Sequence, residues 1–433
     1  MLRSLHSSSS SDTDNNSGGC KNNGGGDAAA VGGGAGGVGR AVAAAPSTRD
    51  LLLACADLLQ RGDLSAARRA AEIVLSAASP RGDAADRLAY HFARALEFRV
   101  DAKTGRVVVV GGALPVSAWS ASSGAYLAFN QIAPFLRFAH LTANQAILEA
   151  VDGARRVHIL DLDAVHGVQW PPLLQAIAER ADPALGPPEV RITGAGADRD
   201  TLLRTGNRLR AFARSIHLPF HFTPLLLSCA TTPHVAGTST ATGAATTTAS
   251  GGATSLELHP DEMLAVNCVM FLHNLGGHEL AAFLKWVKAM SPAVVTIAER
   301  EAGGGGDHID DLPRRVGVAM DHYSAVFEAL EATVPPGSRE RLAVEQEVLG
   351  REIEAAVGPS GDRWWRGIER WGGAARGAGF AARPLSAFAV SQARLLLRLH
   401  YPSEGYLVQE ARGACFLGWQ TRPLLSVSAW QSS

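Results

Sequence analysis

The chain has 433 residues, with 40 Lys and Arg against 41 Asp and Glu, so its formal net charge is −1. This length allows one large or two moderate domains with a substantial core. The balanced charge excludes a global field that would draw the whole protein onto nucleic acid, so any DNA contact has to come from a local basic patch. No apolar run approaches the roughly 20 residues of a membrane helix, and we expect no membrane partner.

Cysteine usage and the N-terminus indicate an intracellular soluble protein. The five cysteines are odd in number and include no CxxC pair, which favours free thiols over disulfides or structural zinc. Residues 1–46 are low-complexity Ser, Asn, Gly and Ala tracts with no apolar segment typical of a secretory signal. Such a composition cannot bury enough apolar surface to offset its ordering entropy, so we expect this segment to be disordered.

Three short amphipathic helices are predicted between residues 47 and 104. The first begins at a capping-box-like pair, Ser47 and Asp50, and presents Leu51, Leu58 and Leu59 at helical spacing. Together the helices predict a helical cap. Its apolar faces either pack only on each other or also meet a second protomer, and the sequence leaves both open. Those three leucines are therefore candidates for a partner surface.

The centre of the chain reads as strand, loop and helix. The strand is a short apolar run without polar alternation, which is typical of a strand buried on both faces; it contains Val157, His158, Ile159, Leu160 and Asp161. Pro171 and Pro172 then open a helix, since proline suits a first turn. Asp161, Asp163 and His166 thus follow the strand's carboxyl end, where ligands of open α/β sheets usually bind.

The remaining elements predict a doubly wound α/β sheet. We expect a helix capped by Thr142 before the central strand, then alternating elements: strands at 190–193, 219–222, 264–269 and 294–298, with helices at 200–216 and 279–290. Residues 230–255 look like a disordered surface insertion. Two helical segments divided by Pro335-Pro336-Gly337 are expected to join the cap. Short strands near residues 406–409, 414–419 and 424–430 are expected to extend the sheet edge in antiparallel pairing.

The turn after the central strand is where such a sheet would bind a nucleotide or S-adenosylmethionine. That turn normally needs several glycines so that backbone N–H groups can approach the ligand, but residues 161–167 contain only Gly167. No acidic residue ends the second strand, where a ribose hydroxyl would need one. The sequence therefore favours a Rossmann-like scaffold without a cofactor. An S-adenosylmethionine-dependent, methyltransferase-like enzyme is the alternative.

Other candidate chemistry is sparse. Asp161, Asp163 and His166 are types that bind divalent metals, but a further ligand is not identifiable, and loop carboxylates more often accept backbone N–H bonds. We expect no metal. GxSxG, HExxH and P-loop patterns are absent, so no catalytic residues are assigned.

Two surfaces are candidates for macromolecular contact. The predicted 200–216 helix carries several arginines, of which Arg204, Arg208 and Arg214 could meet DNA phosphates; such a row is more often a solvated helix face. Five of the eight tryptophans lie in the last seventy residues. Most are expected in the core, but Trp371, Trp419 and Trp430 are also candidates for a partner groove.

Several motifs in the right order resemble the GRAS family of plant transcriptional regulators. VHILD (157–161) is similar to the family's VHIID core, and residues 51–69 resemble its first leucine-rich region. RITGAG precedes a segment like the second leucine-rich region. Pro292, Tyr323 and Arg339-Glu340 stand where the PFYRE region would be. The W-x7-G and W-x10-W spacings and the final Ser428-Ala429-Trp430 match the SAW region. The sequence is most similar to the Lateral suppressor/MONOCULM branch, which in grasses controls axillary shoots and tillering.

The resemblance implies a methyltransferase-like, Rossmann-like core with an α-helical cap and the family's region boundaries. These would be a GRAS domain at 47–433, divided into a leucine-rich region I at 47–104, a VHIID region at 123–190, a leucine-rich region II at 199–231, a PFYRE region at 264–354 and a SAW region at 357–433.

It also implies a nuclear, non-enzymatic transcriptional regulator of shoot branching. Such a regulator would act through other GRAS proteins, as homo- or heterodimers, and through zinc-finger transcription factors, with DNA met directly or through these partners. No cofactor is implied. Arg68-Arg69 and Arg314-Arg315 are too sparse to mark a nuclear import signal.

Overall fold

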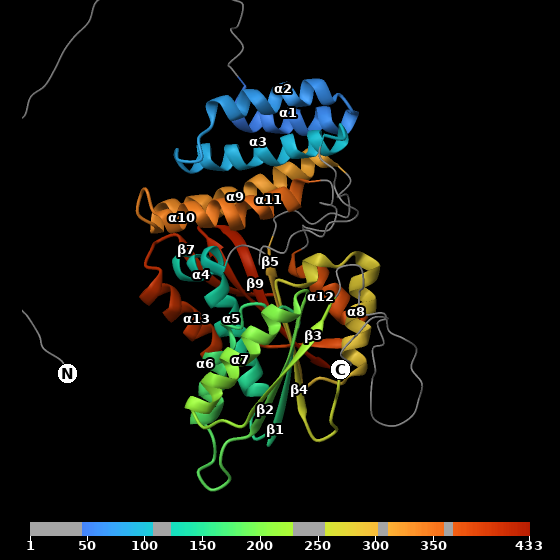
Figure 1. The fold of residues 1–433 in the computed structure, drawn as a ribbon, viewed down its shortest axis with the longest axis vertical. Coiled ribbons are helices and arrows are strands. Elements are labelled where there is room, and N and C mark those ends of the chain that lie inside the picture. Colours follow the sequence, from blue (N-terminus) through green and yellow to red (C-terminus); the bar gives the residue numbers. More distant parts are fainter. Residues whose placement is uncertain (1–45, 107–122, 228–255, 302–310, 359–366) are drawn as a thin grey trace, which may run out of the picture. The chain divides into compact units, whose positions relative to one another are not determined.

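A mixed β-sheet lies at the centre of the part of the chain that the structure describes (Figure 1). The computed structural model describes residues 46–106, 123–227, 256–301, 311–358 and 367–433; the expectations for residues 1–45 and 230–255 lie outside these ranges. The strands follow the order β3-β2-β1-β4-β5-β9-β8-β7, and β6 also pairs with β9. Their bounds are β1 Arg156–Asp161, β2 Glu189–Gly196, β3 Phe220–Leu226, β4 Met263–Val269, β5 Val294–Arg300, β6 Phe380–Arg383, β7 Tyr406–Ala411, β8 Ala414–Trp419 and β9 Arg422–Ser432.

Strands β1 to β5 are parallel, and the later strands join in antiparallel pairing, as the sequence predicts. Helices cover both faces. Val157 and Ile159 of β1 pack with residues of α5, α6 and α7, whereas Leu160 packs with residues of α8 and α12. This two-sided burial explains why β1 is apolar without alternation. The helix bounds are α4 Ser123–Ile132, α5 Phe135–Ala150, α6 Trp170–Glu179, α7 Arg199–Ser215, α8 Gly277–Ala289, α12 Ile368–Gly377 and α13 Ala387–His400. The fold is α/β and Rossmann-like.

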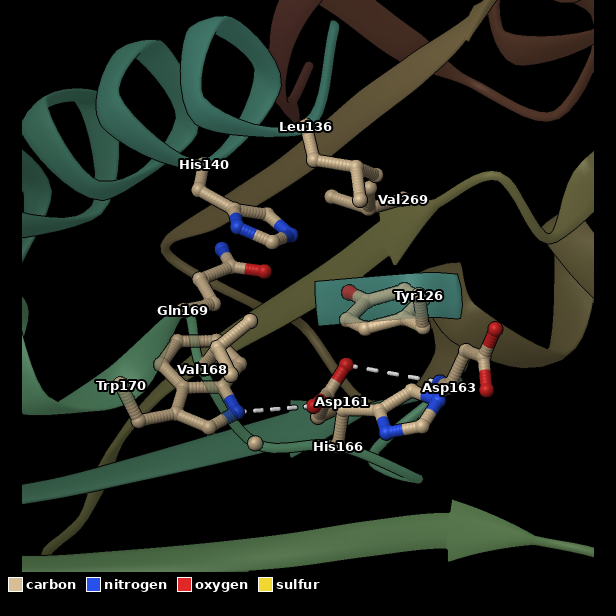
Figure 2. A pocket seen from close by; sticks show the side chains of 11 residues that line it. Tyr126, Leu136, His140, Asp161, Asp163, His166, Val168, Gln169, Trp170 and Val269 are labelled. Atoms are coloured by element: carbon tan, nitrogen blue, oxygen red, sulfur yellow. Dashed lines mark hydrogen bonds between the residues drawn. The ribbon is translucent and has the colours of Figure 1, made fainter. Parts of the chain in front are cut away.

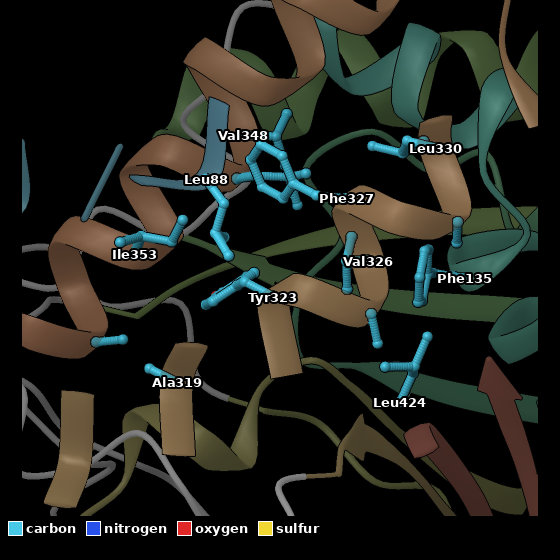
Figure 3. Packing of buried hydrophobic residues seen from close by; sticks show 14 of the residues in the cluster. Leu88, Phe135, Ala319, Tyr323, Val326, Phe327, Leu330, Val348, Ile353 and Leu424 are labelled. Atoms are coloured by element: carbon cyan, nitrogen blue, oxygen red, sulfur yellow. The ribbon is translucent and has the colours of Figure 1, made fainter. Parts of the chain in front are cut away.

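The helical cap combines two distant parts of the sequence. Its first part is α1 Thr48–Arg61, α2 Leu64–Ala77 and α3 Ala84–Lys103. Its second part is α9 Leu312–Thr333, α10 Arg339–Val344, the π-helical turn Glu345–Leu349 and α11 Gly350–Val357. Helix α9 contacts α1 and α3, and α11 contacts α3. Figure 3 shows Leu88 beside Phe327 within the shared core. The expectation that the later helices join the cap is confirmed.

Local capping explains where the cap helices begin. Ser47 accepts from the backbone N–H of Asp50, and the Asp50 carboxylate accepts from the N–H of Ser47, which is the predicted capping box. Asp63 and Asp83 cap α2 and α3 in the same manner, each accepting one backbone N–H. Gly62 ends α1 with φ 86°, a conformation that favours glycine.

A buried ion pair joins the two parts of the cap. Arg87 on α3 donates through Nε to Glu345 at 2.9 Å, and the side chains are only 2% and 1% exposed. Arg87 Nη1 also reaches Glu331 of α9 at 2.7 Å and the carbonyl of Gly82 at 2.8 Å. The guanidinium therefore bridges three segments, and its charge is compensated where water cannot reach it.

One expected helix start is wrong. Thr142 was expected to cap a helix, but α5 begins at Phe135 after Pro134, and Thr142 lies buried in its middle. Proline fixes a backbone angle suited to a helix start, so α5 begins there and continues through the threonine. Strand β2 also runs three residues beyond Thr193, to Gly196, because its pairing with β3 continues.

Removing the Arg87 charge should destabilise the cap strongly. We expect Arg87→Ala to lower the free energy of unfolding by about 3 to 5 kcal/mol, because Glu345 would stay buried without its partner. Arg61→Ala is the matched control, since Arg61 pairs with Asp57 in solvent and should cost less than about 1 kcal/mol. Urea unfolding measures both; equal losses would contradict the bridging role.

Candidate functional site

Several backbone N–H groups in the loop between β1 and α6 donate hydrogen bonds to acceptors within the chain. The Leu162 N–H donates to the Asn267 carbonyl at 3.2 Å, and the Ala164 N–H donates to the Ala195 carbonyl at 2.9 Å. The Asp163 N–H points at the Asp161 carboxylate at 3.4 Å, and the Trp170 N–H donates to the Gly167 carbonyl at 3.3 Å. In a cofactor-binding sheet these are the groups that approach the ligand. Here each has an acceptor within the chain.

The single glycine and the two prolines of this segment have structural explanations. Gly167 has φ 64°, and a Cβ there would lie 2.5 Å from Thr205 of α7. A glycine is therefore required at position 167 by the turn conformation and by the close packing against α7. Pro171 and Pro172 occupy the first turn of α6, so two backbone N–H groups that could bind an anion at this helix start are missing.

Asp161 is the centre of a buried polar network (Figure 2). Its carboxylate accepts from the Trp170 indole at 2.8 Å and from the Asn267 amide at 3.2 Å. Gln169 exchanges two hydrogen bonds with Asn267, both 3.1 Å, and its amide also donates to Asn144 of α5. Thus β1, β4, α5 and α6 meet in one set of bonded side chains. Burial raises the pKa of Asp161 to about 6, against the opposing hydrogen bonds from Trp170 and Asn267.

The remaining space at the sheet edge is small. The cavity has a volume of about 20 Å³, which is room for roughly one water molecule. Its lining includes Tyr126, whose ring stacks on His166 with centroids 3.7 Å apart, and His140 of α5. Burial, followed by the charge of Asp161, raises the pKa of Asp163 well above its usual value. Within the described residues, no group of three or more His, Cys, Asp or Glu side chains is arranged to hold a metal ion.

His158 of the predicted VHIID motif lies in a second buried network. Its Nε2 is 2.8 Å from the Thr193 hydroxyl and its Nδ1 is 3.2 Å from the Arg191 guanidinium, which itself pairs with Glu262. Because arginine can only donate, Nδ1 is the acceptor and Nε2 carries the proton. Burial, then the Arg191 charge, lowers the pKa of His158 to about 4, so the ring is neutral at pH 7. Val157, Ile159 and Leu160 are core residues.

The predicted arginines are exposed on α7. Arg204, Arg208 and Arg214 all face solvent. Arg208 also donates to the His166 carbonyl at 3.1 Å, so it fastens the β1–α6 loop. Arg204 lies within the same helix's first half, near Thr201 and Asp198. Arg204 and Arg214 are therefore the two that meet solvent without holding the loop.

The structure places most of the predicted partner-surface residues in the core. Leu59, Trp371, Trp419 and Trp430 are each at most 4% exposed, and Leu51 and Leu58 are half-buried against the cap. Trp371 and Trp430 pack between α8, α12 and the sheet, whereas Trp419 packs edge-on to Tyr406. These four side chains fill the interior and cannot meet a partner without unfolding.

Sequence reasoning missed the amide members of the Asp161 network. Asn267 is fully buried in β4, and Asn144 and Gln169 are nearly so. A signal existed, because Asn267 interrupts the apolar run Leu264–Val269 that was predicted as a buried strand. A polar side chain in such a strand needs a buried partner.

Comparison with known proteins decides the family. The profile of the GRAS domain family matches residues 48–431. The chain belongs to the GRAS domain family. It is 90% identical over 397 residues to Protein MONOCULM 1 of Oryza sativa subsp. japonica, covering 90% of this chain and 89% of that protein. It is 39% identical over 425 residues to Scarecrow-like protein 18 of Arabidopsis thaliana, covering 88% and 91%.

A solved GRAS structure supports the architecture. The crystal structure of SCL7 in Oryza sativa aligns with a TM-score of 0.66 and 32% identity, covering 89% of this chain and all of that one. The expected family and fold class are confirmed, and this GRAS chain is a plant transcriptional regulator. None of the helices that the structure describes is long and apolar enough to cross a membrane.

Titration of Asp161 should make the stability of the fold depend on pH. Its pKa is about 6 in the folded chain and about 3.9 when unfolded, so the folded state holds the proton more tightly. The protonated carboxyl makes its full contribution to the free energy of unfolding below pH about 4. This contribution is lost as the pH rises through about 6, which lowers the free energy of unfolding by about 3 kcal/mol.

We therefore expect Asp161→Asn, which cannot titrate, to become more stable relative to the natural chain as the pH rises from about 4 to 7. At the acidic end the variant should be less stable by about 1 to 3 kcal/mol, because its amide faces another donor, either Trp170 or Asn267. Urea unfolding across this pH range is the measurement, with the exposed Asp152→Asn as control. A stability difference between the two chains that does not change with pH would contradict a raised pKa for the buried Asp161 carboxyl.

Proposed function

We propose that this GRAS protein acts in the nucleus as a non-enzymatic regulator of axillary shoot and tiller formation, working through protein–protein contacts. One observation carries the non-enzymatic part: the backbone N–H groups of Leu162, Asp163, Ala164 and Trp170 have acceptors within the chain, and the cavity beside them is about 20 Å³. The 90% identity to Protein MONOCULM 1 of rice supports the developmental role.

The alternative function is an S-adenosylmethionine-dependent enzyme that binds its ligand at the carboxyl end of β1. It would need the Trp170–Asp161–Asn267 network to separate so that a ligand could enter. Separation would deprive a buried carboxylate, an indole N–H and an amide N–H of these hydrogen bonds, at about 1 to 3 kcal/mol for each group. This cost favours the regulator.

The proposed partners are other GRAS proteins and zinc-finger transcription factors. Contacts with a second GRAS chain would use the outer face of the cap. Ile73 on α2 is 54% exposed, and it is the large apolar side chain that α2 presents to solvent. Leu51 and Leu58 lie on α1 and are half-buried against the core of the cap.

The cap proposal predicts concentration-dependent association. We expect Ile73→Asp to weaken self-association, or capture of a second GRAS protein, by about tenfold or more, because a carboxylate would be placed in an apolar contact. Sedimentation over a range of concentrations measures this. Leu185→Asp is the matched control, since Leu185 is 63% exposed on a loop away from the cap helices. A strictly monomeric natural chain that captures no GRAS partner would refute the cap surface.

We assign direct DNA contact to α7. The helix carries five arginines and one acidic residue, Asp200, so it is locally basic in a chain of net charge −1. A few phosphate contacts give weak, strongly salt-dependent binding. The exposed Arg204 and Arg214 would supply them.

Charge reversal tests this assignment. We expect Arg204→Glu with Arg214→Glu to reduce DNA affinity by about tenfold or more at low salt and to flatten its salt dependence. The paired control is Arg81→Glu with Arg314→Glu, both exposed on the cap. Fluorescence anisotropy with labelled duplex DNA reads both variants, and circular dichroism confirms folding. Equal binding by the two variants would move DNA contact to another surface or to a partner.

A further inference from the structure

Helix α13 presents a second apolar face to solvent. Phe388, Leu395 and Leu399 are 54%, 41% and 63% exposed. They are separated by seven and four residues, so they lie along one side of the helix. The helix's core side carries the buried Ala389, Val390, Ala393 and Leu397 and contacts α5 and β7. Burial within the chain therefore does not explain the outer stripe.

Exposed apolar residues are concentrated around this helix. Eight large apolar side chains are exposed in the described part of the chain, and three of them form the stripe. Two others lie on adjoining elements: Leu407 on β7, which contacts α13, and Leu127 on α4. The Tyr401 hydroxyl, next to the end of α13, donates to the Asn130 carbonyl of α4 at 3.3 Å. Single exposed leucines are ordinary, but a gathering of them marks an interaction site.

The charged side chains that α13 itself contributes have one sign. Helix α13 contains Arg394 and Arg398 and no acidic residue. Arg394 pairs with Glu410 of β7 at 3.1 Å, so its charge is largely compensated. Arg398 is exposed and has no ion pair among the residues described. A partner lying along the stripe therefore meets positive charge at its flank.

We propose that the Phe388–Leu395–Leu399 stripe is a docking surface for an amphipathic helix of a partner protein with acidic residues beside its apolar face. The stripe supplies the apolar contact and Arg398 the complementary charge. A second copy of this chain fits less well, because α13 itself carries only basic charged residues and the carboxylate beside it, Glu410, is already paired with Arg394. The surface is separate from the outer face of the cap and from α7, and it goes beyond the contacts of the proposed function.

The test uses the full chain and a labelled synthetic peptide of about five helical turns, with leucines at helical spacing flanked by glutamates. We expect saturable binding by fluorescence anisotropy. Leu395→Ser with Leu399→Ser should weaken it about tenfold or more. Arg398→Glu should weaken it several-fold and reduce its salt dependence. Leu185→Ser, which alters a similarly exposed apolar residue on the loop before β2, should bind as the natural chain does, and thermal melts should show all variants folded.

Three results would overturn the proposal. These are no saturable binding of the acidic peptide, undiminished binding by the Leu395→Ser/Leu399→Ser variant, and equal binding of a peptide with lysines in place of the glutamates. Sedimentation tests whether a second copy of this chain, rather than an acidic helix, covers the stripe. If the natural chain dimerises and the serine double variant is monomeric, the stripe is a self-association surface and the acidic-helix assignment is wrong.

Discussion

The buried hydrogen bond from the Trp170 indole to the Asp161 carboxylate fixes the part of the molecule on which the functional account depends. It ties the end of β1 to the start of α6 across the loop that, in a cofactor-binding sheet, would stay open for the ligand. The same carboxylate holds Asn267, and through Gln169 the network reaches Asn144 of α5. A buried carboxylate is costly unless its acceptors are filled, and these donors fill them.

This arrangement places side chains of the protein itself at the carboxyl end of β1, where ligands of open α/β sheets usually bind. The chain's accessible chemistry is accordingly found on its helices. The two parts of the cap are held together by a shared core and by Arg87, which joins α3 to α9 and to Glu345. Helices α7 and α13 offer a basic row and an apolar stripe at other places on the same scaffold.

Hydrophobic periodicity and the residues that start or end helices and strands predicted nearly all of the elements. Capping residues, Pro pairs and apolar runs determine secondary structure through local interactions, so they can be recognised in the sequence. They could not place Thr142 within α5, since a threonine suits a cap or a helix interior and only the start at Pro134 distinguishes them. The strand edge was recognised from Asp161, but its partner Asn267 lies 106 residues away, and sheet pairing brings the two together. For the tryptophans, the sequence alone could not distinguish a core position from a partner surface. The structure shows that Trp371, Trp419 and Trp430 are buried. The α13 stripe went unnoticed because exposure is a property of the whole fold.

The central claim is that side chains of the chain itself occupy the carboxyl edge of the sheet. Isothermal titration of the purified protein with S-adenosylmethionine tests it most directly, because that ligand would need the Trp170–Asp161 bond to open. The account predicts no binding heat at ligand concentrations up to about 1 mM, the weak end of the usual affinity scale. A saturable isotherm in the micromolar range would contradict it and would make the enzyme the better description.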